Sequence, residues 1–122
     1  MGRTICGTGT IARAYTSMTI IRVPIVRWVD DHNPGWVECA LTDVAGLTWS
    51  LVDKLPIFSE DVNLDANSNY PQPGELACEI VGEEADSRGR KIIIIDTRSP
   101  WGVEAVDGTT RFHVLPEQVE IV

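Results

Sequence analysis

Hydrophobic and polar residues alternate in short segments along most of the chain, a pattern typical of β-strands that bury one face. The clearest pair of segments is 36–42 and 47–55, joined by the short loop 43–46, which contains Gly46. We predict a β-hairpin here. The residues expected to face the core are Val37, Cys39 and Leu41 in the first segment and Leu47, Trp49 and Leu51 in the second.

The remaining segments follow the same pattern and predict an all-β protein. The other expected strands are 19–29, 75–81, 91–97, 103–106, 109–115 and 119–122. Pro24 marks an edge or a bulge in the first of them. The Asp107-Gly108 pair predicts a tight turn that joins 103–106 to 109–115. Short strands at this spacing favour a small antiparallel barrel or sandwich.

Helical structure is expected only in single turns. One helical turn is expected within residues 59–64, at the start of the long polar connection 59–74, and a 3₁₀ turn at residues 116–118. A proline-led turn followed by a short terminal strand resembles the end of an SH3-like barrel. A likeness of fold says nothing about function.

The first 17 residues differ from the rest, since they contain three glycines, four threonines and no acidic residue. We interpret residues 1–17 as a leader or a tag-like N-terminal extension, and residues 18–122 as a single β domain. Residues 7–12 read GxGxxA, but no strand precedes them, so they do not predict a dinucleotide site. No apolar segment approaches the roughly 18 residues of a membrane span, and we expect no membrane association.

Charge narrows the choice of partner. The chain has 18 acidic and 10 basic residues, and because Arg3 and Arg13 precede Met18, residues 18–122 carry 18 acidic and 8 basic residues. Such a surface repels the phosphate backbone, so we do not expect nucleic acid as a partner. A basic protein fits the charge better. The alternative is that the charge only keeps a small domain soluble.

The cysteines point to a reducing compartment. Cys6, Cys39 and Cys78 are odd in number and unclustered, which argues against a disulfide framework. Cys39 and Cys78 alternate with aliphatic residues and are expected to face the core as inert thiols. We therefore expect a cytoplasmic protein.

Two groups of residues in the sequence offer side chains that could bind a metal ion. Asp61, Asn63 and Asp65 offer alternating oxygen ligands, but the glycine and the bidentate glutamate of a calcium loop are missing. They are a weak calcium candidate, with turn-capping side chains as the alternative. The second group is Asp30, Asp31 and His32, which Cys39 or His113 would have to complete. Nothing in the sequence brings the two histidines together, and Cys39 is expected to face the core. The sequence indicates no metal and no cofactor.

The sequence shows no nucleophile motif and no cysteine paired with a histidine, so we lean against an enzyme. Tryptophans beside carboxylates are instead typical of a protein-binding patch. The residues of this candidate patch are Trp28, Asp30, Asp31, His32, Trp36 and Trp101. The alternative is that these rings cap the ends of the barrel.

Four segments, 34–38 (PGWVE), 52–58 (VDKLPIF), 70–74 (YPQPG) and 116–118 (PEQ), resemble a group of small uncharacterised bacterial all-β proteins. The resemblance spans roughly residue 20 to the end. It implies a bacterial, cytoplasmic origin and assigns no catalytic residue.

Taken together, these features predict a small acidic binding protein without evident catalysis, of which an immunity or antitoxin protein is one form. The alternative is a small enzyme or ligand-binding barrel with its pocket near the 59–74 loop. A homodimer is compatible with both, because residues 19–29 and 92–95 are apolar on both faces of a strand.

Overall fold

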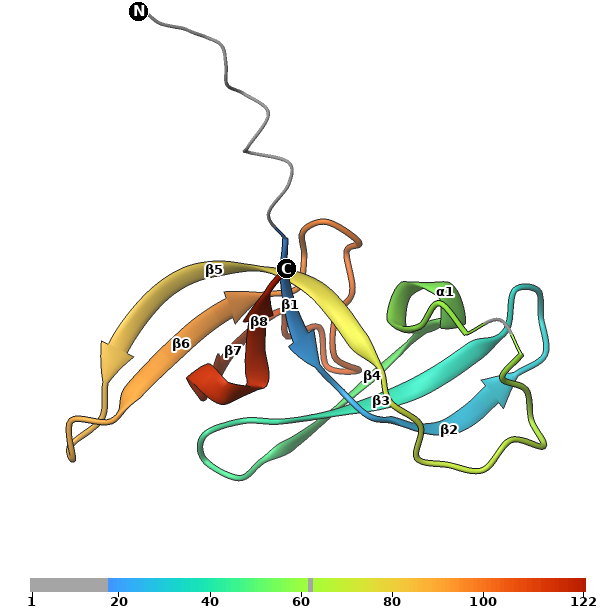
Figure 1. The fold of residues 1–122 in the computed structure, drawn as a ribbon, viewed down its shortest axis with the longest axis horizontal. Coiled ribbons are helices and arrows are strands. Elements are labelled where there is room, and N and C mark those ends of the chain that lie inside the picture. Colours follow the sequence, from blue (N-terminus) through green and yellow to red (C-terminus); the bar gives the residue numbers. More distant parts are fainter. Residues whose placement is uncertain (1–17, 62) are drawn as a thin grey trace, which may run out of the picture.

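The computed structural model describes residues 18–61 and 63–122, so the expected leader lies outside the described residues. Two antiparallel sheets form this part of the chain, with strand orders β7-β6-β5-β1-β8 and β2-β3-β4 (Figure 1). The strands are β1 (Thr19–Arg22), β2 (Ile25–Asp30), β3 (Trp36–Thr42), β4 (Thr48–Lys54), β5 (Glu75–Ala85), β6 (Lys91–Asp96), β7 (Arg111–Val114) and β8 (Val119–Ile121). The prediction of an all-β protein is confirmed, and so is the 3₁₀ turn η3 (Pro116–Gln118) before the last strand.

The single first strand expected from the sequence is in fact two strands that belong to different sheets. β1 pairs with β5 and β8, whereas β2 pairs with β3. The break falls at Pro24, which has no N–H to donate to a sheet. On either side of it, Val23 N and Ile25 N donate to the carbonyls of Gly74 (3.0 Å) and Gln72 (2.8 Å). Pro24 therefore marks the point where the chain passes from one sheet to the other.

The hairpin of β3 and β4 is confirmed, with one correction. Trp49 and Leu51 contribute to the core side as expected, but Leu47 is 59% exposed. It belongs to the turn rather than to β4, because its N–H donates to Asp43 Oδ1 (3.0 Å), which also accepts from Ala45 N (2.9 Å).

The expected strand 103–106 is wrong, although the turn that follows it exists. Ala105 N donates to Thr109 O (2.9 Å) and Gly108 N to Ala105 O (2.8 Å). Only an isolated bridge between Ala105 and Leu51 of β4 ties this segment to a sheet. The segment is instead held through buried Val103, whose carbonyl accepts the Thr97 hydroxyl (2.7 Å).

The helical turn lies earlier than expected. It is α1 (Leu55–Phe58), directly after β4, and not within residues 59–64. Leu55 and Phe58 are spaced three apart and are both buried, and Pro56 near the first helical position favours the start of a helix there. No helix of the described residues is long and apolar enough to cross a membrane.

A single hydrophobic cluster joins the two sheets. Its fully buried members include Ile21, Ile25, Leu51 and Ile95. The strands that are apolar on both faces are largely covered within the chain itself, since Ile20, Ile21, Ile92, Ile93 and Ile95 are at most 6% exposed. A second subunit is therefore not needed to explain these residues, and the homodimer stays a prediction.

Candidate functional site

The turn between β2 and β3 is held by its own acidic side chains. Asp30 Oδ1 accepts a hydrogen bond from His32 N (2.6 Å), and the Trp28 indole Nε1 donates to Asp31 Oδ1 (2.7 Å). Gly35 N closes the turn on His32 O (2.7 Å). Both carboxylates are thus fixed in position while Asp30, Asp31 and His32 remain exposed.

Trp28 and Trp36 lie on opposite faces of the three-stranded sheet. Trp28 is opposite Val37 in the register and contacts the core. Trp36 is opposite Asp30 on one side and Lys54 on the other, so these three side chains share the outer face. Trp28 therefore supports the turn from the core side, whereas Trp36 lies on the outer face, and both rings are half-buried.

Lys54 covers part of one face of the Trp36 ring. Its Nζ lies 4.9 Å from the ring centroid, a cation–π contact. Lys54 and Trp36 together with Val29, Asp30 and His32 form the end of the outer face, where a shallow hollow is lined by Val29, Asp30, His32 and Trp36. The ring can accept a cation, and in this chain it already does.

Farther along the same face of the sheet, the positive charge of Arg27 balances the negative charge of Glu38. Arg27 Nε donates to Glu38 Oε1 (2.5 Å), and the Ser50 hydroxyl donates to Glu38 Oε2. The hydrogen bond from Ser50, and after it that from Arg27, lowers the pKa of Glu38 below its usual range in spite of partial burial. The charge of Glu38 is therefore balanced by side chains of the same sheet, unlike the charges of Asp30 and Asp31 in the turn.

The long 59–74 loop begins next to the β2–β3 turn. A hollow between them is lined by Asn33, Pro34, Leu55, Pro56, Ser59 and Asp61. The two regions that the sequence proposed separately, the acidic turn and the loop, are thus neighbours.

The weak calcium candidate behaves as a set of turn caps. Asp61 Oδ1 accepts from Asn63 N (2.9 Å), and Asp65 Oδ1 accepts from Asn67 N (2.8 Å). Side chains that bond to the backbone two residues on form Asx turns. Across residues 18–61 and 63–122, no group of three or more His, Cys, Asp or Glu side chains is placed to hold a metal ion.

Trp101 lies apart from the rest of the predicted patch. It is 58% exposed in the loop between β6 and β7, and it lines a different hollow with Met18, Ile57, Glu60, Glu75 and Ala77. In Figure 1, α1 lies between this loop and the β2–β3 turn. The patch expected from the sequence is therefore divided, with Trp101 on one side of α1 and the other five residues on the far side.

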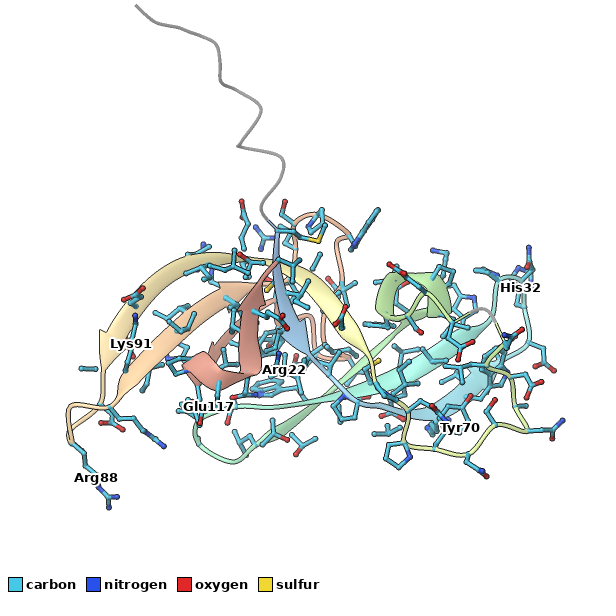
Figure 2. All side chains as sticks on the ribbon, in the orientation of Figure 1. Arg22, His32, Tyr70, Arg88, Lys91 and Glu117 are labelled. Atoms are coloured by element: carbon cyan, nitrogen blue, oxygen red, sulfur yellow. The ribbon has the colours of Figure 1, made fainter. Side chains whose placement is uncertain are left out.

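Charge is unevenly distributed over the molecule. Of the 18 acidic side chains, seven form ion pairs within the described residues: Glu38, Asp53, Glu83, Glu84, Asp86, Asp96 and Glu120. Among the eleven that do not, Asp30, Asp31, Asp61 and Asp65 come from the β2–β3 turn and the start of the 59–74 loop; the other seven are Asp43, Glu60, Glu75, Glu79, Glu104, Asp107 and Glu117. Arg88 and Lys91 lie at the end of the molecule opposite His32 (Figure 2). We call the surface formed by Asp30, Asp31, Asp61, Asp65 and Trp36 the acidic end.

The thiols and the second histidine are not part of this surface. Cys39 and Cys78 are buried, as predicted, and burial raises the pKa of each thiol to about 12. His113 points away from the core, with Nδ1 3.4 Å from Glu84 Oε1. Cys6 lies outside the described residues.

The sequence missed two parts of the site. Lys54 could have been found, because the predicted hairpin places it opposite Trp36. Glu60 and Glu75 could not, because they are brought beside Trp101 by contacts between distant segments. Comparison of the chain with family models, with curated proteins and with solved structures finds no match. Function must accordingly be argued from the geometry above.

Proposed function

We propose that this chain is a non-catalytic binding protein that recognises a basic protein through its acidic end, in the manner of an immunity protein or an antitoxin. The observation that carries the proposal is the gathering of unpaired carboxylates at one end of the molecule. Asp30, Asp31, Asp61 and Asp65 form no ion pair within the described residues, whereas the other unpaired carboxylates come from separate segments and Arg88 and Lys91 lie at the opposite end (Figure 2).

Uncompensated charge at one end has a clear physical role. It attracts an oppositely charged partner over a distance and raises the rate of encounter. Trp36 adds a large ring, and tryptophan is enriched among the residues that dominate the binding energy of interfaces. The same charge repels phosphate groups, so the proposed partner is a protein and not a nucleic acid.

A cytoplasmic location is part of the proposal. Cys39 and Cys78 are buried as free thiols, and protein thiols are kept reduced in the cytoplasm. Two thiols with raised pKa values contribute no reactive group to the surface. They support packing and not chemistry.

The alternative, a pocket for a small ligand near the 59–74 loop, has less support. The hollow beside that loop has a volume of about 270 Å³, and its polar lining is Asn33, Ser59 and Asp61. Pockets for small ligands usually measure about 300–1,000 Å³, so this hollow is smaller than is usual. The surface is better suited to a macromolecule that covers it.

The test is affinity purification at low salt with a charge variant and a matched control. The variant Asp30→Asn, Asp31→Asn and Asp61→Asn keeps the hydrogen-bond acceptors of the turn and removes three charges from the acidic end. The control Glu79→Gln, Glu104→Gln and Glu117→Gln removes three charges elsewhere. We expect a basic protein, released by salt, to bind the unchanged chain and the control and to be lost by the variant.

Mass spectrometry of the eluted proteins identifies the partner. If no basic protein is retained, or if one is retained equally by both charge variants, the acidic end is not the recognition surface and the proposal is wrong.

A further inference from the structure

The hollow at Trp101 continues the acidic end across α1. It shares Pro56 and Ser59 with the hollow beside the β2–β3 turn, so the two flank the same short helix. Glu60 lines the one and Asp61 the other. The surface therefore runs from the β2–β3 turn over α1 to Trp101, and it carries negative charge on both sides of the helix.

The backbone around Trp101 is closed by hydrogen bonds, although the ring itself is exposed. Its loop starts at fully buried Thr97, whose hydroxyl donates to Val103 O (2.7 Å). Gly102 N donates to Arg98 O (2.7 Å), which closes the turn around the tryptophan. The backbone at Trp101 is thereby fixed, and a tryptophan side chain has only two χ angles to order when a partner covers it.

The hollow has the chemistry of a site for a cationic side chain. Its walls are mainly apolar, with Met18, Ile57 and Ala77 beside Trp101. The two charged residues that line it, Glu60 and Glu75, are both acidic, and neither has an ion-pair partner in the described part of the chain. Lys and Arg combine an aliphatic stem with a cation that is attracted to the face of a tryptophan ring.

We propose that the Trp101 hollow binds a Lys or Arg side chain from an extended basic segment of the partner, which crosses α1 to reach the acidic end. This inference rests on the proposed function and names the form in which the partner is recognised. In an extended segment, side chains on one face repeat every second residue, at about 6.5–7 Å. Residues four apart on such a segment lie about 13–14 Å from each other, which exceeds the helix diameter of about 10–12 Å, so two cations of one segment can lie on the two sides of α1.

The experiment uses the full chain labelled with ¹⁵N and a short synthetic peptide in which arginine alternates with leucine or glycine. Its counterpart carries glutamate in place of arginine. The indole N–H signals of the four tryptophans, assigned with Trp→Phe variants, report binding at low salt. We expect the arginine peptide to shift Trp101 and Trp36 but not Trp49, whose indole is bonded to Asp43 Oδ2 (2.9 Å). The glutamate peptide should shift none of them.

Substitutions then test the hollow itself. Trp101→Ala should weaken binding of the arginine peptide about five- to tenfold, as for the loss of an aromatic anchor. Val106→Ala is the matched control, because Val106 is also exposed (77%) in the segment between β6 and β7 but does not line the hollow. Glu75→Gln leaves the walls intact and should weaken binding about twofold.

Each contrary result has a separate meaning. If only Trp36 shifts and Trp101→Ala binds as the unchanged chain does, this inference is wrong while the proposed function stands. If neither Trp101 nor Trp36 shows a salt-dependent shift, the proposed function fails as well. If Arg13→Glu shifts the Trp101 indole without peptide, the chain's own N-terminal segment covers the hollow and the inference is wrong.

Discussion

Gly35 is the residue on which the geometry of the acidic turn depends. Its φ of +103° lies in the left-handed region, where a side chain is strained. The Trp28 ring covers it so closely that a methyl group there would overlap Trp28 Cη2 and lie 2.9 Å from Cζ2. The same ring orients Asp31 through its indole. Because Gly35 has no side chain, the Trp28 ring can lie against it and hold the Asp31 carboxylate through its indole N–H.

Gly35→Ala is expected to destabilise the protein by about 2–4 kcal/mol, because backbone strain and overlap with Trp28 add together. Gly108→Ala is the control: Gly108 has a similar φ (+91°) and nothing within 4 Å of its Cβ position. It should lose only about 1–2 kcal/mol to backbone strain. Urea unfolding monitored by tryptophan fluorescence measures both. Equal losses would show that the Trp28 contact adds nothing.

At the scale of elements, the turn between β3 and β4 depends on one carboxylate. Asp43 Oδ1 accepts from Ala45 N and Leu47 N, and Oδ2 accepts from the Trp49 indole. Partial burial alone would raise the pKa of Asp43, but the hydrogen bond from Trp49 and those from the two backbone N–H groups outweigh it and lower the pKa. The carboxylate thereby joins the turn to the core, because Trp49 stacks edge-on against Phe112.

Asp43→Ala should cost about 1–3 kcal/mol of unfolding free energy at pH 7, since three donors lose their acceptor. A group whose pKa is lowered on folding stabilises the protein above its unfolded value, near 4, and this contribution is lost as pH falls through the folded value. The difference between Asp43→Ala and the unchanged chain should therefore narrow below pH 4.

Asp107→Ala is the matched control, because Asp107 Oδ1 caps only Thr109 N (3.0 Å) in a solvent-exposed turn. It should cost less than Asp43→Ala. Chemical denaturation at several pH values measures both variants. A pH-independent loss in Asp43→Ala would contradict the role of the ionised carboxylate.

For the whole molecule, the position of a charge matters more than the total. Lys54 lies over Trp36 at the acidic end, whereas Arg88 lies at the opposite end, in the turn between β5 and β6 (Figure 2). In physiological salt, charges separated by more than about 8 Å are largely screened. Two variants with the same net charge should thus differ in how they bind a basic partner.

Lys54→Gln is expected to strengthen binding of the arginine peptide about twofold, because it removes a repelling cation and uncovers the face of Trp36. Arg88→Gln removes the same charge at the far end and should leave the affinity unchanged at physiological salt. Titration calorimetry compares the two. An equal gain in both variants would mean that net charge, and not the acidic end, controls binding.

The sequence by itself determined the local structure where one face of a strand is buried. Alternation placed Val37, Cys39 and Leu41 in the core, and the glycine-containing loop fixed the hairpin. It also predicted the turn at Asp107-Gly108. These features depend on neighbours in the chain, and the period of two fixes which side each residue faces.

Only the tertiary structure decided which surfaces these elements share. Whether Pro24 bends one strand or separates two depends on the partners of each half, which are β5 and β8 on one side and β3 on the other. The position of α1, fixed by burial of Leu55 and Phe58, divides Trp101 from Trp36 and brings Glu60 to the hollow. Contacts between residues far apart in sequence set these positions. Hydrophobic patterning along the chain does not show which distant segments come into contact.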